Sequence, residues 1–320
     1  MKKIICLILI MAMLFSFSCN LSNDTPNTSA TTTAATVGQQ NPPPPTPQAP
    51  PRDVPSGYDS YNFRAMEKDI MPMRQDIYAV KGGYNLPMNI FAPEVENANN
   101  NVAILCIHGG GWNTSLRVGS TFTSDWMRHQ ARYYASLGFY TFEITYRSIN
   151  QGFTIKDLQD DVEDAMRYIN QTVKAEFGID KVITIGDSAG GHLVLCLALA
   201  EDESLRPYAT IACNPVSNCV GTIWTGGISD PEVGKTVSPL HLAKKTDGKI
   251  LIIHGTADTV VDPGDSQALY DALAEKENEV DLVWLDGATH AFILYGYQTP
   301  KENVDTYMAM TVEYINGILS

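Results

Sequence analysis

The sequence predicts an α/β fold with a mostly parallel central sheet and helices on both faces of that sheet. Apolar, strand-like runs alternate with amphipathic runs of helical period along most of the chain, and this alternation is typical of parallel sheets covered by helices. Residues 58–320 form the predicted domain, because about 260 residues are ample for one domain of this class. No internal repeat is visible in the sequence.

The first residues have the pattern of an export signal. Met1-Lys2-Lys3 is basic, and the apolar stretch over 4–17 is too short to span a bilayer comfortably. Cys19 follows at a place that resembles a bacterial lipobox, in which the cysteine thiol is lipidated. The sequence therefore predicts a lipoprotein-type signal peptide over 1–19 and an exported protein tethered to a membrane through Cys19, in the periplasm or at the cell surface. An ordinary secretory signal that ends near a cysteine is the alternative.

A polar, proline-rich stretch separates this signal from the predicted domain. Residues 20–57 consist mostly of Ser, Thr, Asn, Gln, Ala and Pro, with consecutive prolines from Pro42 to Pro45. Such a composition cannot build a hydrophobic core, so we expect a disordered and partly polyproline linker.

Within the domain, periodicity places the elements in order. The clearest helical patterns cover Thr123–Leu137, Ile155–Lys174, Pro263–Glu275 and Lys301–Ile318. Short apolar runs predict strands at Val102–Ile107, Lys181–Ile185, Ile250–Ile253 and Val280–Leu285.

The hexapeptide GDSAGG at 186–191 directly follows one of these strands. It fits G-x-S-x-G, the nucleophile elbow, in which a strand turns sharply into a helix and leaves the serine at the tip. Gly186 and Gly190 allow the close approach of strand and helix. A glycine-rich turn or a phosphate-binding loop is the competing interpretation of so short a pattern, but no G-x-x-x-x-G-K-[ST] occurs in the chain. Ser188 is therefore the candidate nucleophile, with Asp187 as an orienting or electrostatic neighbour.

Candidate partners for this serine follow three other strand-like runs. The segment HGGGW at 108–112 is of the kind that supplies backbone N–H groups to an oxyanion hole. Asp258 lies in HGTAD just after the run over 250–253, and His290 follows the run over 280–285. Nucleophile, acid and base thus occur in the chain order Ser188, Asp258, His290.

Together these motifs resemble the α/β-hydrolase superfamily, and more narrowly its hormone-sensitive-lipase-like and feruloyl/acetyl-esterase-like (BD-FAE type) branch. The matching segments are HGGGW at 108–112, Tyr146-Arg147, GDSAGG at 186–191, Ser238-Pro239-Leu240, HGTADTVVD at 254–262 and GATHAF at 287–292. The chain departs from many relatives at Tyr146–Ile149, which reads Tyr-Arg-Ser-Ile where they have Tyr-Arg-Leu-Ala-Pro. The resemblance implies an α/β-hydrolase fold and oxyanion donors at the amides of Gly110, Gly111 and Ala189.

The function that follows is a serine carboxylesterase acting on short-acyl or carbohydrate-linked esters. Ser188 would attack the ester carbonyl, His290 would transfer the proton, and Asp258 would orient the imidazole, through an acyl-enzyme intermediate. An amidase or peptidase, an arylformamidase-like hydrolase, and a non-catalytic pseudo-esterase used for binding remain as alternatives.

Several nearby residues compete for these roles. Asp262 lies four residues beyond Asp258, but Asp258 directly follows the strand, where members of the family place the acid. We expect His108 to brace the oxyanion loop, His254 to form a hydrogen bond near its strand end, and His192 to be a core residue. His129 and His241 lie in polar surroundings and are expected at the surface.

Composition narrows the partners further. No H-E-x-x-H or C-x-x-C is present, so neither a metal nor another cofactor is predicted. The formal net charge of −14 argues against binding to nucleic acid. Cys106 and Cys196 lie in apolar patterns and are expected to be buried thiols. Cys213 and Cys219 are either a disulfide or two free thiols, and the sequence leaves both possibilities open.

Overall fold

A computed structural model describes residues 71–97, 99–113, 117–118, 121–221, 230–293 and 301–320. All of them belong to one compact unit, residues 43–320. The predicted signal peptide over 1–19 and the linker over 20–57 lie outside the described residues. No helix in the described part of the chain has the length and apolarity needed to cross a membrane.

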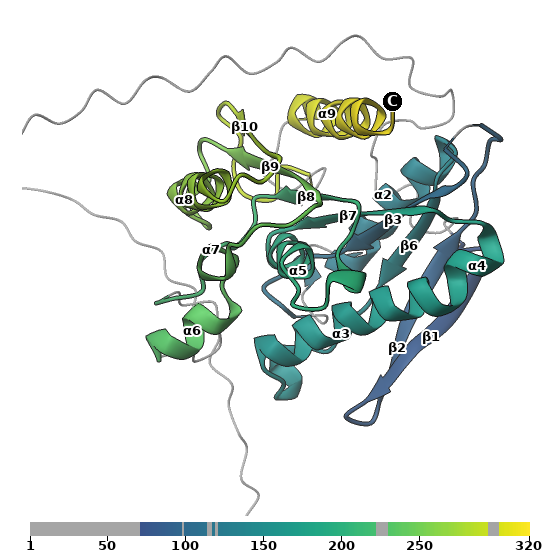
Figure 1. Cartoon of the computed structure of the whole chain (residues 1–320), viewed down its shortest axis with the longest axis horizontal. Coiled ribbons are helices and arrows are strands. Elements are labelled where there is room, and N and C mark those ends of the chain that lie inside the picture. Colours follow the sequence, from purple (N-terminus) through teal and green to yellow (C-terminus); the bar gives the residue numbers. More distant parts are fainter. Residues whose placement is uncertain (1–70, 98, 114–116, 119–120, 222–229, 294–300) are drawn as a thin grey trace, which may run out of the picture. The chain divides into compact units, whose positions relative to one another are not determined.

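An eight-stranded sheet lies at the centre of this unit (Figure 1). Its spatial order is β1 (Arg74–Lys81), β2 (Tyr84–Phe91), β6 (Tyr140–Ile144), β3 (Val102–Ile107), β7 (Lys181–Asp187), β8 (Ala209–Cys213), β9 (Lys249–Gly255) and β10 (Val280–Leu285). β2 pairs antiparallel with both β1 and β6, and every other neighbouring pair is parallel. The predicted α/β fold with a mostly parallel sheet is therefore confirmed.

Helices cover both faces of the sheet, and strand β3 shows why. Its side chains alternate between two cores: Ala103, Leu105 and Ile107 belong to one, and Val102, Ile104 and Cys106 to the other. The first core includes residues of α3 (Ile155–Tyr168), α5 (Ala189–Ala198) and α8 (Pro263–Glu275). The second includes residues of α2 (Thr123–Ser136) and α9 (Lys301–Leu319), which lie across the sheet from α3 and α5 in Figure 1. Because both faces are buried, β3 reads as a continuous apolar run.

The remaining elements are short. They are the strands β4 (Arg117–Val118) and β5 (Thr121–Phe122), the helices α4 (Lys174–Phe177), α6 (Pro231–Val237) and α7 (Pro239–Leu242), the 3₁₀ turns η1 (Ile149–Gln151) and η3 (Glu203–Leu205), and the π-helical turn η2 (Ile169–Val173). The single helix predicted over 155–174 is thus divided, since η2 separates α3 from α4. Nothing in the apolar pattern distinguishes a π-helical turn from continued α-helix.

Local sequence explains where α3 and α8 begin. Thr154 and Asp157 form a capping box at the start of α3. At α8, the Asp262 side chain accepts a hydrogen bond from the Gly264 amide at 2.8 Å, and Pro263 occupies the first turn. Asp262 is therefore a helix cap.

A buried ion pair fixes the segment after β6 to α3. The Arg147 Nη2 atom lies 2.8 Å from Oδ1 of Asp161, whose side chain is fully buried. Asp161 also accepts a hydrogen bond from the Arg147 amide at 3.0 Å. Arg147 belongs to the Tyr-Arg motif at 146–147, one residue beyond the end of β6, so this pair anchors that motif to the helix layer.

The structure also settles the status of the cysteines and of two histidines. Cys106, Cys196, Cys213 and Cys219 are all buried free thiols, so Cys213 and Cys219 do not form a disulfide. His241 is exposed, as predicted. The expectation for His129 is wrong, because this residue is only 3% exposed. It lies on α2 between Arg128 and Gln130, and burial lowers the pKa of its imidazole to about 4.

Candidate active site

Ser188 lies at a sharp turn between the end of β7 and the start of α5. Its backbone has φ +50° and ψ −116°, a conformation that costs a serine on the order of 1–3 kcal/mol. The Ser188 amide donates to the Cys213 carbonyl at 2.9 Å, which holds the turn against β8. A Cβ atom at Gly190 would lie 2.1 Å from the Ile107 carbonyl oxygen, so only glycine fits there. The elbow geometry expected from the motif is therefore present.

The structure brings Ser188, His290 and Asp258 into one hydrogen-bonded series. Nε2 of His290 lies 3.0 Å from Oγ of Ser188, and Nδ1 of His290 lies 2.7 Å from Oδ2 of Asp258. The three residues follow β7, β9 and β10, whose carboxyl ends meet at one edge of the sheet, as is usual for ligand sites in α/β proteins. Asp258 is fully buried, whereas 14% of the His290 side chain is exposed.

Asp258 is held as an ionised carboxylate. Oδ1 accepts hydrogen bonds from the amides of Val260 and Val261 at 2.8 and 3.0 Å, and Oδ2 accepts from both His290 and His254. Burial acts to raise the pKa of this carboxyl, but the hydrogen bonds from His254 and His290 outweigh it and lower the pKa well below its usual range. Asp258, not the helix cap Asp262, is therefore the carboxylate that contacts His290.

The glycine-rich loop after β3 lies against this elbow. The Gly109 amide donates to Oδ1 of Asp187 at 2.9 Å, and Asp187 is the residue just before the serine. Burial raises the pKa of Asp187 to about 6, although the bond from Gly109 acts to lower it. Gly110 and Gly111 have φ values of +102° and +62°, which a residue with a side chain rarely adopts.

His108 braces the same loop, as the sequence predicted. Its Nδ1–H donates to the Gly109 carbonyl at 2.7 Å, and its ring stacks on Tyr146 with 4.4 Å between ring centroids. The Tyr146 hydroxyl in turn donates to the His108 carbonyl at 2.7 Å. Burial lowers the pKa of His108 to about 4, so its ring is neutral near pH 7.

Three backbone amides in these two segments are candidate donors to a negatively charged oxygen. Among the described residues, the amides of Gly110 and Gly111 have no hydrogen-bond acceptor. The amide of Ala189 lies at the open N-terminal end of α5, where helical N–H groups have no partner within the helix. The close approach of Gly190 to Ile107 brings the loop and this helix end together. The arrangement can therefore combine a nucleophile, a base and anion-stabilising donors.

Known proteins that resemble this chain include esterases. The BD-FAE family model matches residues 88–212. A thermophilic esterase from Thermogutta terrifontis, solved with propionate bound, superposes with a TM-score of 0.65 at 25% identity, covering 78% of this chain and 96% of that one. Esterase 2 of the same organism, phosphonylated by cyclosarin, gives 0.65 at 26% identity, covering 77% and 94%.

A relative known from its sequence agrees with these structures. A probable isoprenylcysteine alpha-carbonyl methylesterase of Oryza sativa subsp. japonica is 25% identical over 218 residues, which are 58% of this chain and 49% of the plant protein. The present chain thus spans about half the length of that relative. The chain thus has the α/β-hydrolase fold and resembles esterases of that fold.

A further hydrogen bond links the glycine-rich loop to the elbow helix. Trp112, which ends the HGGGW motif, donates its Nε1–H to Nδ1 of His192 at 3.2 Å. His192 donates Nε2–H to the Val237 carbonyl at 2.7 Å, and its ring is fully buried. His192 is therefore the core histidine that the sequence predicted, and it also connects the loop, α5 and α6.

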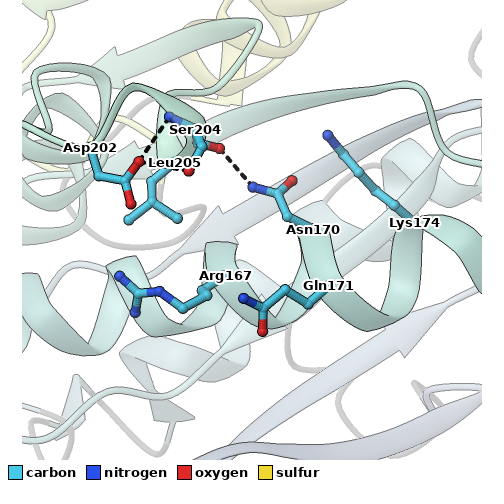
Figure 2. A pocket seen from close by; sticks show the side chains of 7 residues that line it. All are labelled: Arg167, Asn170, Gln171, Lys174, Asp202, Ser204 and Leu205. Carbon is cyan, nitrogen blue, oxygen red and sulfur yellow. Dashed lines mark hydrogen bonds between the residues drawn. The ribbon is translucent and has the colours of Figure 1, made fainter.

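A cavity of about 390 Å³ lies elsewhere in the molecule (Figure 2). It is lined by Arg167, Asn170, Gln171, Lys174, Asp202, Ser204 and Leu205. These residues come from α3, η2, α4 and the segment around η3, and none belongs to the elbow, to the glycine-rich loop or to the segments carrying Asp258 and His290. Figure 2 shows Asn170 directed at the Ser204 carbonyl, to which it donates at 2.9 Å. This polar cavity is separate from the serine site.

The described residues contain no group of three or more His, Cys, Asp or Glu side chains that could hold a metal ion.

The sequence did not indicate one neighbour of the site. Ser266, on α8, lies with its Oγ 2.7 Å from Nδ1 of His254. No motif marks this serine, and its place beside β9 depends on how α8 packs on the sheet.

Proposed function

We propose that this hydrolase is a serine carboxylesterase that cleaves short-acyl or carbohydrate-linked esters with Ser188, His290 and Asp258. The observation that supports this most directly is the continuous series of hydrogen bonds from Ser188 through His290 to Asp258. The amides of Gly110 and Gly111 in the glycine-rich loop and of Ala189 at the start of α5 are the proposed donors for the oxyanion.

In the first half-reaction, Oγ of Ser188 forms a bond to the ester carbonyl carbon while Nε2 of His290 takes the hydroxyl proton. The carbonyl oxygen becomes an oxyanion, which the loop amides stabilise, and loss of one such donor typically costs about 10²–10³ in rate. Collapse of the tetrahedral intermediate breaks the bond to the alcohol oxygen. The alcohol leaves with the proton from His290, and the acyl group remains on Ser188.

In the second half-reaction, water attacks the acyl-enzyme carbonyl and gives its proton to Nε2 of His290. The acid product leaves as the bond to Oγ breaks and His290 returns the proton to Ser188. Throughout, the ionised Asp258 accepts from Nδ1–H of His290, which keeps Nε2 free for proton transfer and stabilises the imidazolium when it forms.

Two lines of support bear on the substrate. The propionate-bound esterase that superposes on this chain is consistent with a short acyl group. The proposal that the alcohol part of the ester is a carbohydrate is supported by the resemblance of the motifs to those of feruloyl and acetyl esterases.

The test compares the full chain with its Ser188→Ala variant in the hydrolysis of a p-nitrophenyl ester series from acetate to decanoate. We expect turnover that is fastest with acetate, falls with acyl length and is absent from the variant. Equal rates for the two proteins would refute a role for Ser188.

Asp258→Asn should lower kcat by roughly 10³–10⁴, because His290 would then adopt the wrong tautomer. Asp262→Asn is the matched control, because Asp262 only caps α8, and a larger loss there would refute the assignment of Asp258.

We also propose that Cys19 carries a lipid that tethers the exported enzyme to a membrane. Its support is the basic start, the short apolar stretch and the position of Cys19 in the sequence. In a bacterial host, Cys19→Ala should move the enzyme from the membrane fraction to the soluble fraction. Cys6→Ala, which changes a cysteine inside the apolar stretch, is the matched control and should stay with the membrane. Retention of Cys19→Ala in the membrane fraction would contradict the proposal.

A further inference from the structure

His254 occupies an unusual place beside the predicted acid. It lies near the carboxyl end of β9, it is fully buried, and its Nε2 atom is 3.1 Å from Oδ2 of Asp258. The same oxygen receives Nδ1–H of His290 at 2.7 Å. Two imidazole rings therefore share one carboxylate oxygen, although only the ring of His290 contacts Ser188.

The surrounding atoms fix which nitrogen of His254 carries its proton. Nε2 faces two acceptors, Oδ2 of Asp258 and the Val261 carbonyl oxygen at 3.3 Å, so this nitrogen must be protonated. Nδ1 lies 2.7 Å from Oγ of Ser266, a fully buried hydroxyl whose partner among the described residues is this nitrogen. The Ser266 hydroxyl thus donates to Nδ1, and His254 is the neutral Nε2–H tautomer.

With this tautomer, each oxygen of Asp258 is held from a fixed direction. Oδ1 is held by the amides of Val260 and Val261, which belong to the turn after Asp258. Oδ2 is held by His254, which belongs to the central sheet. The carboxylate cannot rotate without losing one of these bonds at a buried position, where an unsatisfied charged group is costly. The direction that Oδ2 presents to His290 is therefore set by β9.

We propose, resting on the esterase function above, that neutral His254 is a positioning residue whose Nε2–H, oriented by Ser266, holds Oδ2 of Asp258 in place for His290. His254 touches neither the nucleophile nor solvent, so it acts only through Asp258. Its loss should therefore lower kcat and leave KM nearly unchanged.

Two substitutions at one position make a matched test in the full chain. The amide nitrogen of His254→Gln can reach the place of Nε2 and donate to Asp258. The shorter His254→Asn can reach only the place of Nδ1, beside Ser266. We expect kcat for p-nitrophenyl acetate to fall about 10- to 100-fold in His254→Asn, since small misplacements of catalytic groups have effects of this size. His254→Gln should stay within about fivefold of wild type, and KM should change less than about twofold in both variants. Equal losses in the two variants, or wild-type kcat in His254→Asn, would overturn the proposal.

A second measurement does not depend on the folding of His254→Asn. Histidine ¹⁵N NMR of the wild-type chain at neutral pH should show His254 with one protonated nitrogen, Nε2, assigned by the loss of its signal in His254→Gln. A proton on Nδ1 alone, or on both nitrogens, would overturn the proposal. A wild-type chain that hydrolyses no ester would instead refute the proposed function, independently of this tautomer.

Discussion

Asp187 is a buried carboxyl group whose charge should destabilise the fold at neutral pH. It precedes Ser188, the proposed nucleophile, is only 5% exposed and accepts a hydrogen bond from the Gly109 amide. Burial raises the pKa of this group from the ordinary 3.8 to about 6. Asp187→Asn removes the ionisable group and keeps an oxygen that can accept from Gly109, so it isolates the contribution of the charge.

The size and sign of the effect follow from the pKa. A raised pKa means that the folded state binds the proton more tightly than the unfolded state, so stability is lost as pH rises from about 4 through about 6. One unit of pKa corresponds to about 1.4 kcal/mol, so the full loss is about 3 kcal/mol, of which about 2 kcal/mol falls between pH 4 and pH 8. The free energy of unfolding of Asp187→Asn, relative to that of wild type, should therefore rise by about 2 kcal/mol between pH 4 and pH 8.

Equilibrium unfolding in urea at pH 4, 6 and 8, on both proteins, measures this gain. Other groups that titrate in the interval, such as His108 and His192 with pKa values lowered to about 4, are present in both proteins and cancel in the difference. Any constant effect of the amide also cancels between pH values. A difference in unfolding free energy that does not change with pH, or that turns against Asp187→Asn as pH rises, would refute the reasoning.

Two further substitutions test the packing that positions the site. Asp161→Asn leaves Arg147 buried without its full counter-charge, and urea unfolding should show a loss of about 3–5 kcal/mol. A loss below about 1 kcal/mol would mean that the pair does not anchor the segment. Gly190→Ala should abolish esterase activity and lower the melting temperature, because its Cβ would lie 2.1 Å from the Ile107 carbonyl oxygen. Gly317→Ala on α9 is the control, since nothing lies within 4 Å of the added carbon and alanine favours a helix; equal melting temperatures for the two variants would contradict the steric argument.

Much of the fold could be predicted because burial on both sheet faces leaves a plain apolar signal. The predicted bounds of β3, β10 and α8 coincide with those observed, and α2 and α9 differ by one residue at the C-terminal end. The sequence did not predict the π-helical turn over 169–173, because it depends on backbone hydrogen bonding rather than on residue period. The burial of His129 was missed as well, since polar neighbours along the chain conceal a helix face that packs on the sheet.

The candidate site residues could be picked out from the sequence for a different reason. Motifs around Ser188, Asp258 and His290 must keep special backbone geometry, so glycines and chain order identify them. The residues that support the site carry no such mark: Ser266 becomes a partner of His254 only once α8 has packed beside β9. Supporting contacts of this kind join segments far apart in the sequence, and a single sequence does not indicate which segments will meet.

The order of the strands explains how these separate pieces are held in register. The Ser188 amide bonds to the Cys213 carbonyl at the end of β8, and the next residue, Asn214, donates to the Ile253 carbonyl of β9 at 2.7 Å. The residue after Ile253 is His254, which holds Asp258. Ser188 and Asp258 are thus connected by backbone hydrogen bonds through neighbouring strands, whereas His290 lies on the segment after β10 and contacts the other two through its ring. Because the strands fix Ser188 and Asp258, the position of His290 depends on the direction in which Asp258 presents Oδ2. His254 on β9 restrains that oxygen and therefore affects His290 without contacting it.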